Sequence, residues 1–387
     1  MTTLKIVSTF GIVATVTLGL SGCVLNNPTS GEAITVTSSA SECALSSVEA
    51  PAGTIQFEVL NTGDETTEFY ILANDGMRVI GEVENIGPGL SRNLLIQAPA
   101  GTYYTVCKPG GTGAGIGNAA FTVTESDAQI ELSADTQALV DIAAANYASY
   151  VRNEIDQLTT GTEEFAAAYT AGDFDAARAL YAPTRMHWER VETVAESFGD
   201  LDPRLDLREA DLEEGQEWTG WHAIEKDLWP QDAEPGFQPY DAAKRERLAG
   251  LLVADTLTLQ ANVQDLSFDL PQLTNGAIGL LDEVATGKVT GEEEIWSHTD
   301  LWDFQANVDG AAVLYAGVRD ILVKKNPKLA AQLDEEFALL QKLLDAQRVG
   351  DGFTYYNNLT SAQIKALADQ VNALAEPLNK LTAALVK

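Results

Sequence analysis

From about residue 127 to the end, the apolar residues of this chain recur at steps of three and four, and this periodicity constrains the fold most strongly. Such spacing puts apolar side chains on one face of an amphipathic helix. It predicts helices over 139–158, 242–266, 278–284, 303–323, 329–344 and 360–385, separated by Pro203, Pro230, Pro271, Pro327 and Gly350. We expect Thr160-Gly161 to end the first helix. Residues 127–387 are therefore predicted to form an all-α helical bundle.

Residues 33–126 carry a different pattern, in which short β-prone segments alternate with turn residues. The segments cover 33–37, 54–59, 67–72, 92–97, 103–107 and 120–123, with turns at Asn61-Thr62-Gly63-Asp64, Asn74-Asp75-Gly76, Pro88-Gly89 and Pro99-Ala100-Gly101. Regular strand spacing of this kind predicts a β-sandwich. We therefore expect two domains, an N-terminal β-sandwich and a C-terminal helical bundle.

The first 32 residues are typical of an export signal followed by a tether. Lys5 is the only charged residue before Cys23, and an apolar or small stretch over 6–20 leads into Leu20-Ser21-Gly22-Cys23. This arrangement predicts a signal peptide over 1–22 rather than a membrane span. Because a cysteine directly after small residues resembles a bacterial lipobox, we expect a lipidated Cys23 at the mature N-terminus and a tether over 23–32. Plain secretion with an unmodified Cys23 is the alternative.

The charge balance narrows the choice of partners. Asp and Glu number 57 against 24 Lys and Arg, which gives a net charge of −33. A surface of this charge repels phosphate backbones, so nucleic acid is excluded as a partner. It suits metal cations instead. The predicted signal peptide and lipidated Cys23 in turn indicate an extracytoplasmic protein that is lipid-anchored to the cell membrane. Such a compartment permits disulfides.

Two segments of the predicted β domain, 61–69 and 104–110, resemble the ligand-bearing stretches of cupredoxins. A blue-copper site needs two histidines and a thiolate. The first histidine of the chain is His187, and Glu68 and Gly110 stand where cupredoxins carry histidine. A blue electron-transfer centre is therefore excluded.

Two interpretations of Cys43 and Cys107 remain open. A disulfide between them is favoured, because paired cysteines in an oxidising compartment usually bond. Alternatively Cys43, Cys107 and Glu68, with Met77, form a second, non-blue metal site.

The helical half contains a His-x-x-Glu motif within Thr219-Gly220-Trp221-His222-Ala223-Ile224-Glu225. Residues three apart on a helix lie one turn apart on nearly the same face. His222 and Glu225 can therefore share one ligand, typically a metal ion. A helical salt bridge or a capped surface pair is the structural alternative.

A second motif, 185–192, places Glu189 and Glu192 three residues apart. We predict that both carboxylates are ligands and that His187, which points elsewhere on a helix, is a supporting or structural residue. Arg185 and Arg190 orient or neutralise these carboxylates, or form a salt-bridged face with them. The acidic loop 199–217 is mostly solvated, and of the three adjacent carboxylates in 291–301 at most two reach a common site.

These motifs carry a family resemblance. The TGWHAIE segment matches the GxHxxE signature of the imelysin family, catalogued among M75-type peptidases. With RMHWERVE, GEEEIWSHTDLWDFQANVDGA and the preceding cupredoxin-like domain, the whole mature chain resembles the iron-uptake members of that family. The resemblance implies a helical domain of two four-helix halves with a metal site in its cleft. It implies as ligands Glu189, Glu192, His222 and Glu225, followed by Asp206 and Glu293.

The leading functional interpretation is a lipoprotein that captures iron, as Fe²⁺ or Fe³⁺, and delivers it to a membrane permease. The resemblance also implies a haem-peroxidase-like partner of the same uptake system. Carboxylates with one imidazole accept Zn²⁺ or Cu²⁺ as well. No catalytic residue is expected in this interpretation. A zinc metallopeptidase, for which the HExxH motif is missing, and a cation-bridged polysaccharide-binding protein are the alternatives.

Overall fold

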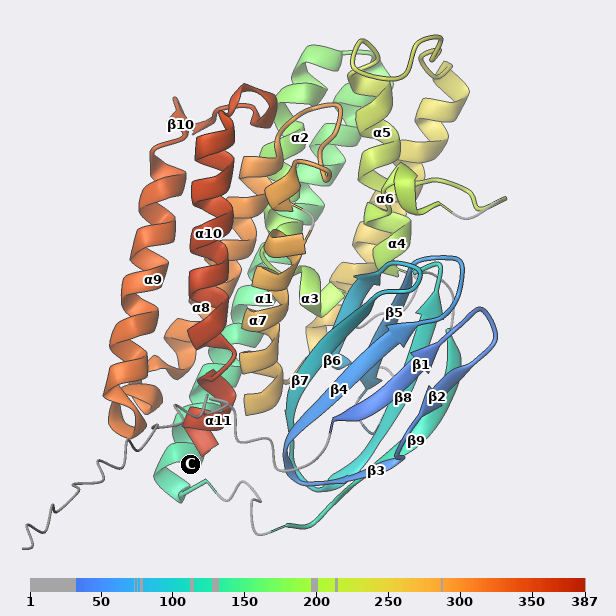
Figure 1. Cartoon of the computed structure of the whole chain (residues 1–387). Coiled ribbons are helices and arrows are strands. Elements are labelled where there is room, and N and C mark those ends of the chain that lie inside the picture. Colours follow the sequence, from blue (N-terminus) through green and yellow to red (C-terminus); the bar gives the residue numbers. More distant parts are fainter. Residues whose placement is uncertain are drawn as a thin grey trace, which may run out of the picture.

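The computed structural model describes residues 33–386 except 73, 75, 77–78, 112–114, 127–131, 196–200, 213–214 and 287. The predicted signal peptide over 1–22, Cys23, the rest of the tether and Met77 lie outside the described residues. The chain folds into a β-sandwich and a helical domain, with the sandwich beside α7 and below α4 (Figure 1). Within the described part, none of the helices combines the length and apolarity of a membrane span.

The sandwich consists of two sheets. Its strands are β1 (Ile34–Ser38), β2 (Cys43–Leu45), β3 (Glu49–Pro51), β4 (Gly53–Asn61), β5 (Thr67–Leu72), β6 (Val79–Ile86), β7 (Ser91–Ala98), β8 (Gly101–Pro109) and β9 (Ile116–Thr124). One sheet has the order β2-β1-β4-β7 and the other β3-β9-β8-β5-β6. Phe57 packs between the sheets against Phe69 and Phe121, with ring centroids 5.3 and 5.5 Å apart. The predicted sandwich is confirmed. Each predicted segment overlaps a strand, whereas β2, β3 and β6 were not predicted.

Cys43 and Cys107 form a disulfide between the two sheets. Their Cα atoms are 5.7 Å apart and 64 residues apart in sequence. A disulfide sulfur is not a thiolate, so this arrangement leaves no thiolate ligand for the alternative metal site with Glu68. The Glu68 carboxylate instead accepts a hydrogen bond of 2.7 Å from the Tyr70 hydroxyl.

The helical domain contains two four-helix halves. Its helices are α1 (Ala134–Ala171), α2 (Phe174–Glu189), α3 (Glu192–Ala195), α4 (Leu201–Asp206), α5 (Gly220–Leu228), α6 (Ala242–Asn262), α7 (Leu270–Thr286), α8 (Asp300–Lys325), α9 (Pro327–Asp345), α10 (Ser361–Leu378) and α11 (Leu381–Val386). The first half combines α1, α2, α5 and α6, and the second combines α7 to α10. Contacts of α8 with α1 and α2 join the halves, and the predicted bundle is confirmed.

The expected end of the first helix at Thr160-Gly161 is wrong. Helix α1 continues to Ala171 and ends at Gly172, whose φ of 77° permits the left-handed cap. A Cβ on Gly161 would lie 2.8 Å from the side chain of Thr184 on α2. The glycine therefore allows α1 and α2 to approach closely instead of terminating the helix. The helical half also contains a short hairpin, β10 (Arg348–Val349) and β11 (Gly352–Phe353), that the periodicity did not predict.

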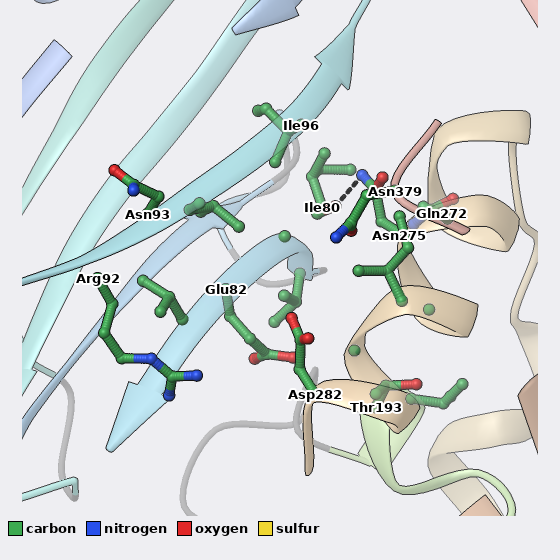
Figure 2. A pocket seen from close by; sticks show the side chains of 18 of the residues that line it. Ile80, Glu82, Arg92, Asn93, Ile96, Thr193, Gln272, Asn275, Asp282 and Asn379 are labelled. Atoms are coloured by element: carbon green, nitrogen blue, oxygen red, sulfur yellow. Dashed lines mark hydrogen bonds between the residues drawn. The ribbon is translucent and has the colours of Figure 1, made fainter. Parts of the chain in front are cut away.

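The two domains enclose a cavity of about 420 Å³ between β6, β7 and α7. The Asn275 side chain on α7 donates a hydrogen bond of 2.7 Å to the Ile80 carbonyl of β6 and links the domains (Figure 2). Figure 2 also shows Glu82 and Arg92 of the sandwich facing Asp282 of α7 across this space. Burial raises the pKa of Asp282 to about 6, although Arg92 opposes the shift.

Candidate metal centre

The His-x-x-Glu pair lies on α5, deep inside the helical domain. His222 is 1% exposed and Glu225 is fully buried, which excludes the surface pair considered above. One ring nitrogen, Nδ1, lies 3.2 Å from the Glu225 carboxylate. This i,i+3 contact is the helical salt bridge considered above as the structural alternative. It leaves the other ring nitrogen, Nε2, facing away from Glu225.

Nε2 of His222 faces two further carboxylates. It lies 3.4 Å from an oxygen of Asp206, the last residue of α4, and 3.5 Å from an oxygen of Glu293. It has no hydrogen-bond partner among the described residues. One atom each from Asp206, His222 and Glu293 lies within 4.8 Å of the others. These three side chains are thus placed to bind one cation together.

Glu225 and Glu294 flank this trio and are held by the loop before α8. One Glu225 oxygen accepts backbone hydrogen bonds from Trp296 (3.1 Å) and Ser297 (2.7 Å). The Glu294 carboxylate accepts a side-chain hydrogen bond of 2.9 Å from the Ser297 hydroxyl. The three adjacent glutamates lie on an irregular loop rather than a helix, and both Glu293 and Glu294 point into the centre.

Glu189 and Glu192 lie beside the centre, but not for the predicted reason. Helix α2 ends at Glu189 and α3 begins at Glu192, so the two do not share a helix. The Lys288 ammonium group lies 2.7 Å from Glu189 and 2.9 Å from Glu192. Asn307 of α8 donates hydrogen bonds to both carboxylates at 3.2 Å. Their oxygens are therefore engaged by protein donors to a greater degree than those of Glu293.

Arg185 is completely buried and connects the carboxylates. Its guanidinium group bonds to Asp206, lies 2.5 Å from Glu189 and 2.5 Å from Glu294, and faces Asp303 at 3.7 Å. Burial opposes the charged form, but Asp206 and Glu294 together raise the pKa of Arg185 well above its usual value. Arg185 and Lys288 are thus fixed internal cations.

The carboxylates around His222 favour its protonated form. Burial alone would lower its pKa, but Asp206 raises the pKa well above the usual value. Burial raises the pKa of Asp303 well above its normal range. A cation that binds to His222 must displace the ring proton, because a metal ligand nitrogen has to be unprotonated.

His187 lies outside this group, as predicted. Its Nδ1 atom lies 2.7 Å from the Glu154 carboxylate of α1. Arg190 also contacts Glu154 at 3.3 Å and Asp309 at 3.3 Å. His187 and Arg190 therefore stabilise the contact of α2 with α1 and α8.

Three members of the centre, Lys288, Asp303 and Asn307, were not predicted from the sequence, whereas Glu294 is one of the three adjacent carboxylates considered above. A sequence pattern could have identified Asp303 and Asn307, because both are polar residues within a largely apolar helix. They are spaced four residues apart on α8 and are fully buried there, among apolar residues of the helical core. Charged and amide side chains on a buried helix face require polar partners, which marks a site. Lys288 had no comparable signal.

The glycine of the motif has a steric role. Gly220 begins α5 with φ of 82°, and a Cβ there would lie 2.1 Å from the Leu205 carbonyl oxygen. This close approach places α4, and with it Asp206, beside His222. The Trp188 indole donates a 2.8 Å hydrogen bond to Asp206 and holds it there.

We expect Gly220→Ala to lower the free energy of unfolding by about 2–4 kcal/mol, because it adds strain in a left-handed conformation and a clash with backbone. Urea denaturation measures this. Gly250→Ala is the matched control, since its Cβ meets nothing within 4 Å and the residue lies inside α6. That control should be neutral or stabilising by up to about 1 kcal/mol. Equal stability of the two variants would contradict the steric role of Gly220.

Comparisons with known proteins cover nearly the whole chain. The family model described as Imelysin (Peptidase_M75) matches residues 143–381, and the Cupredoxin-like domain model matches residues 12–114. The chain is 37% identical over 359 residues to a protein named iron uptake system component EfeO from Escherichia coli (strain K12), covering 91% of each. A protein of the same name from Shigella sonnei (strain Ss046) matches to the same extent.

Proposed function

The chain belongs to the imelysin (M75 peptidase) family, and on this premise we propose that it is an extracytoplasmic iron-binding protein of an EfeO-type uptake system. Relatives that are 37% identical over 91% of the chain are named as iron uptake components. Both domains of the present chain are matched by family models. The domain order supports a shared role rather than a shared fold alone.

The observation that carries the proposal is the arrangement of two carboxylates around Nε2 of His222. Its buried Nε2 atom has no hydrogen-bond partner in the described part of the chain and faces oxygens of Asp206 and Glu293. One imidazole with hard carboxylates suits iron, and it also suits manganese or zinc. We propose Asp206, His222 and Glu293 as the ligands that first hold the ion. Glu225 orients the imidazole through Nδ1, which is the usual role of a carboxylate behind a metal-bound histidine.

Glu189 and Glu192 support the site less directly in this proposal. Lys288 and Arg185 neutralise them, so the ion does not need them as ligands. The internal cations stabilise a carboxylate-rich interior that would otherwise repel itself.

Crystals grown with an iron salt test this site. We expect anomalous density at the iron edge about 2 Å from His222 Nε2, the usual metal–imidazole distance. Density bound only to Glu189 and Glu192, or only in the β domain, would contradict the assignment.

We further propose that iron passes from this centre to a membrane permease, alongside a haem-peroxidase-like partner, and that lipidation at Cys23 holds the protein at the membrane. The Leu20-Ser21-Gly22-Cys23 segment supports the anchor.

Mass spectrometry of membrane-extracted protein is expected to show an N-terminal Cys23 with a diacylglycerol-sized increment. Cys23→Ser should release the protein into the soluble fraction, because its acyl chains are lost. An unmodified peptide that spans Gly22 and Cys23 in the mature protein would rule the anchor out.

A further inference from the structure

We propose that the β domain steers cations into the metal centre, because it forms the outer wall of an acidic cleft whose inner end is lined by Asp206 and Glu293, the two carboxylates that face His222. The inference rests on the proposed function and adds a role for the β domain that requires no metal ligand there. The acidic cleft is the cavity of about 410 Å³ between the β-domain segments 64–68 and 110–111 and the helical domain.

Both domains supply carboxylates to the acidic cleft. Those of the β domain are Asp64, Glu65 and Glu68, and those of the helical domain are Glu192, Asp202, Asp206, Asp211, Glu283 and Glu293. Among the described lining residues, Arg208 alone carries a positive charge. A cleft lined by one sign of charge with low-dielectric walls concentrates counter-ions.

The inner end of the cleft is formed by residues of the proposed metal centre. Asp206 and Glu293 line the cleft and belong to the metal centre. Behind them lies His222 Nε2, buried and without a hydrogen-bond partner among the described residues. A cation that follows the cleft inward therefore arrives between the two carboxylates and the imidazole.

Arg208 stands at this inner end. It donates a 2.8 Å hydrogen bond to Asp211 and lies 3.7 Å from Glu293. Both contacts hold its guanidinium group beside the carboxylates at this end of the cleft.

Two further cations lie behind this end of the cleft. Arg185 bonds to Asp206, and Lys288 lies 2.9 Å from Glu192. Within the described part of the chain, the carboxylates for which the structure records no cation partner therefore include Asp64 and Glu65 at the rim.

The exposed rim provides the cleanest test of steering. Burial raises the pKa of Glu68 to about 7, and burial with Asp206 nearby raises that of Asp202 to about 8. These two groups therefore carry reduced charge at neutral pH. Asp64 and Glu65 are exposed on the rim and form no ion pair that the structure records. Neutralising them should change the field at the entrance without disturbing the fold or the ligands.

The experiment compares the purified protein with its Asp64→Asn/Glu65→Gln variant. Zn²⁺ serves as a redox-inert probe in stopped-flow measurements of tryptophan emission, because Trp188 is hydrogen-bonded to Asp206. At about 10 mM ionic strength, where the Debye length is roughly 30 Å, we expect the association rate constant of the variant to fall about 3- to 10-fold. At about 1 M salt the difference should vanish, and the dissociation rate constant should stay unchanged.

Glu49→Gln/Glu125→Gln is the matched control. It removes the same charge from exposed positions of the β domain. Glu49 pairs with Thr122 and Gly101 pairs with Val123, so the two substituted positions lie near the start of β8 and the end of β9. Gly110, which lines the cleft, follows the other end of β8. We expect this control to leave the association rate within about 2-fold of the unmodified protein, since the charges are distant.

Two outcomes would overturn the inference while leaving the metal centre intact. One is an equal association rate for the rim variant, which would assign entry to the cavity of about 200 Å³ beside His222 and Trp296. The other is an equal loss in both variants, which would reduce the effect to net charge. Failure of the unmodified protein to bind any cation would instead contradict the proposed function itself.

Discussion

His222→Ala is expected to weaken iron binding at least about 10- to 100-fold. Loss of groups that only support metal ligands already costs that much, and His222 provides the nitrogen that faces Asp206 and Glu293. Isothermal titration calorimetry with Fe²⁺ under anaerobic conditions measures the affinity. Circular dichroism checks that the variant is folded.

His187→Ala is the matched control for this measurement. It removes the same side chain from a position 35 residues earlier that contacts Glu154 instead of the metal centre. Its affinity for iron should stay within about 2-fold of the unmodified protein, since no proposed ligand is changed. Equal affinity of both histidine variants and the unmodified protein would place the metal elsewhere.

A pair of isosteric variants separates the two carboxylate groups. Glu293→Gln should weaken binding strongly, because the charge lost is that of a proposed ligand. Glu192→Gln should have a smaller effect, because Lys288 already neutralises Glu192. The reverse order would favour the paired glutamates as the ligands. Zinc-dependent cleavage of peptides that disappears in Glu225→Ala would instead support the peptidase alternative.

Arg185→Met is expected to lower the free energy of unfolding of the metal-free protein by about 3–5 kcal/mol or more. Removing one partner of a buried ion pair leaves uncompensated charge in the interior, and Arg185 contacts Asp206, Glu189 and Glu294 there. Urea denaturation in the presence of a chelator measures the loss. Arg190→Met is the control, since Arg190 is 20% exposed and its loss should cost about 1 kcal/mol.

Added metal ion should recover part of the stability lost in Arg185→Met. A bound cation supplies positive charge to the same carboxylates, and any ligand that binds only the folded state stabilises it. We therefore expect a larger metal-induced increase in Tm for Arg185→Met than for the unmodified protein. An equal increase in the two proteins would show that Arg185 and the ion do not compensate the same charge.

Several parts of the fold and centre follow from residues close together in sequence. The helix periodicity identified the bundle, and the short strand segments identified the sandwich. The spacing of His222 and Glu225 depends on less than one turn of helix, so the structure places them together as expected. Gly161 does not end α1, because it is the small residue that lets α2 pack closely against α1 at Thr184.

The remaining proposed ligands, Asp206 and Glu293, follow from the family resemblance and not from spacing. Asp206 and Glu293 were carried over from matching motifs, and the structure brings both to His222. The resemblance also suggested Glu189 and Glu192 as ligands. It gave no indication that Lys288, almost 100 residues further along, neutralises them.

The sequence by itself predicted which residues could bind a cation, and the tertiary structure shows which of these carboxylates are paired with Arg185 and Lys288. Backbone geometry within one helical turn is local, so periodicity and motif spacing predict it. The choice between ligand and neutralised carboxylate depends on where Arg185 and Lys288 lie, and those contacts join α2, α4, η4 (Lys288–Thr290) and the loop before α8. Charge interactions depend on distance in space and on burial. Sequence spacing predicts neither of these for residues that are about 20 to 100 positions apart in the chain.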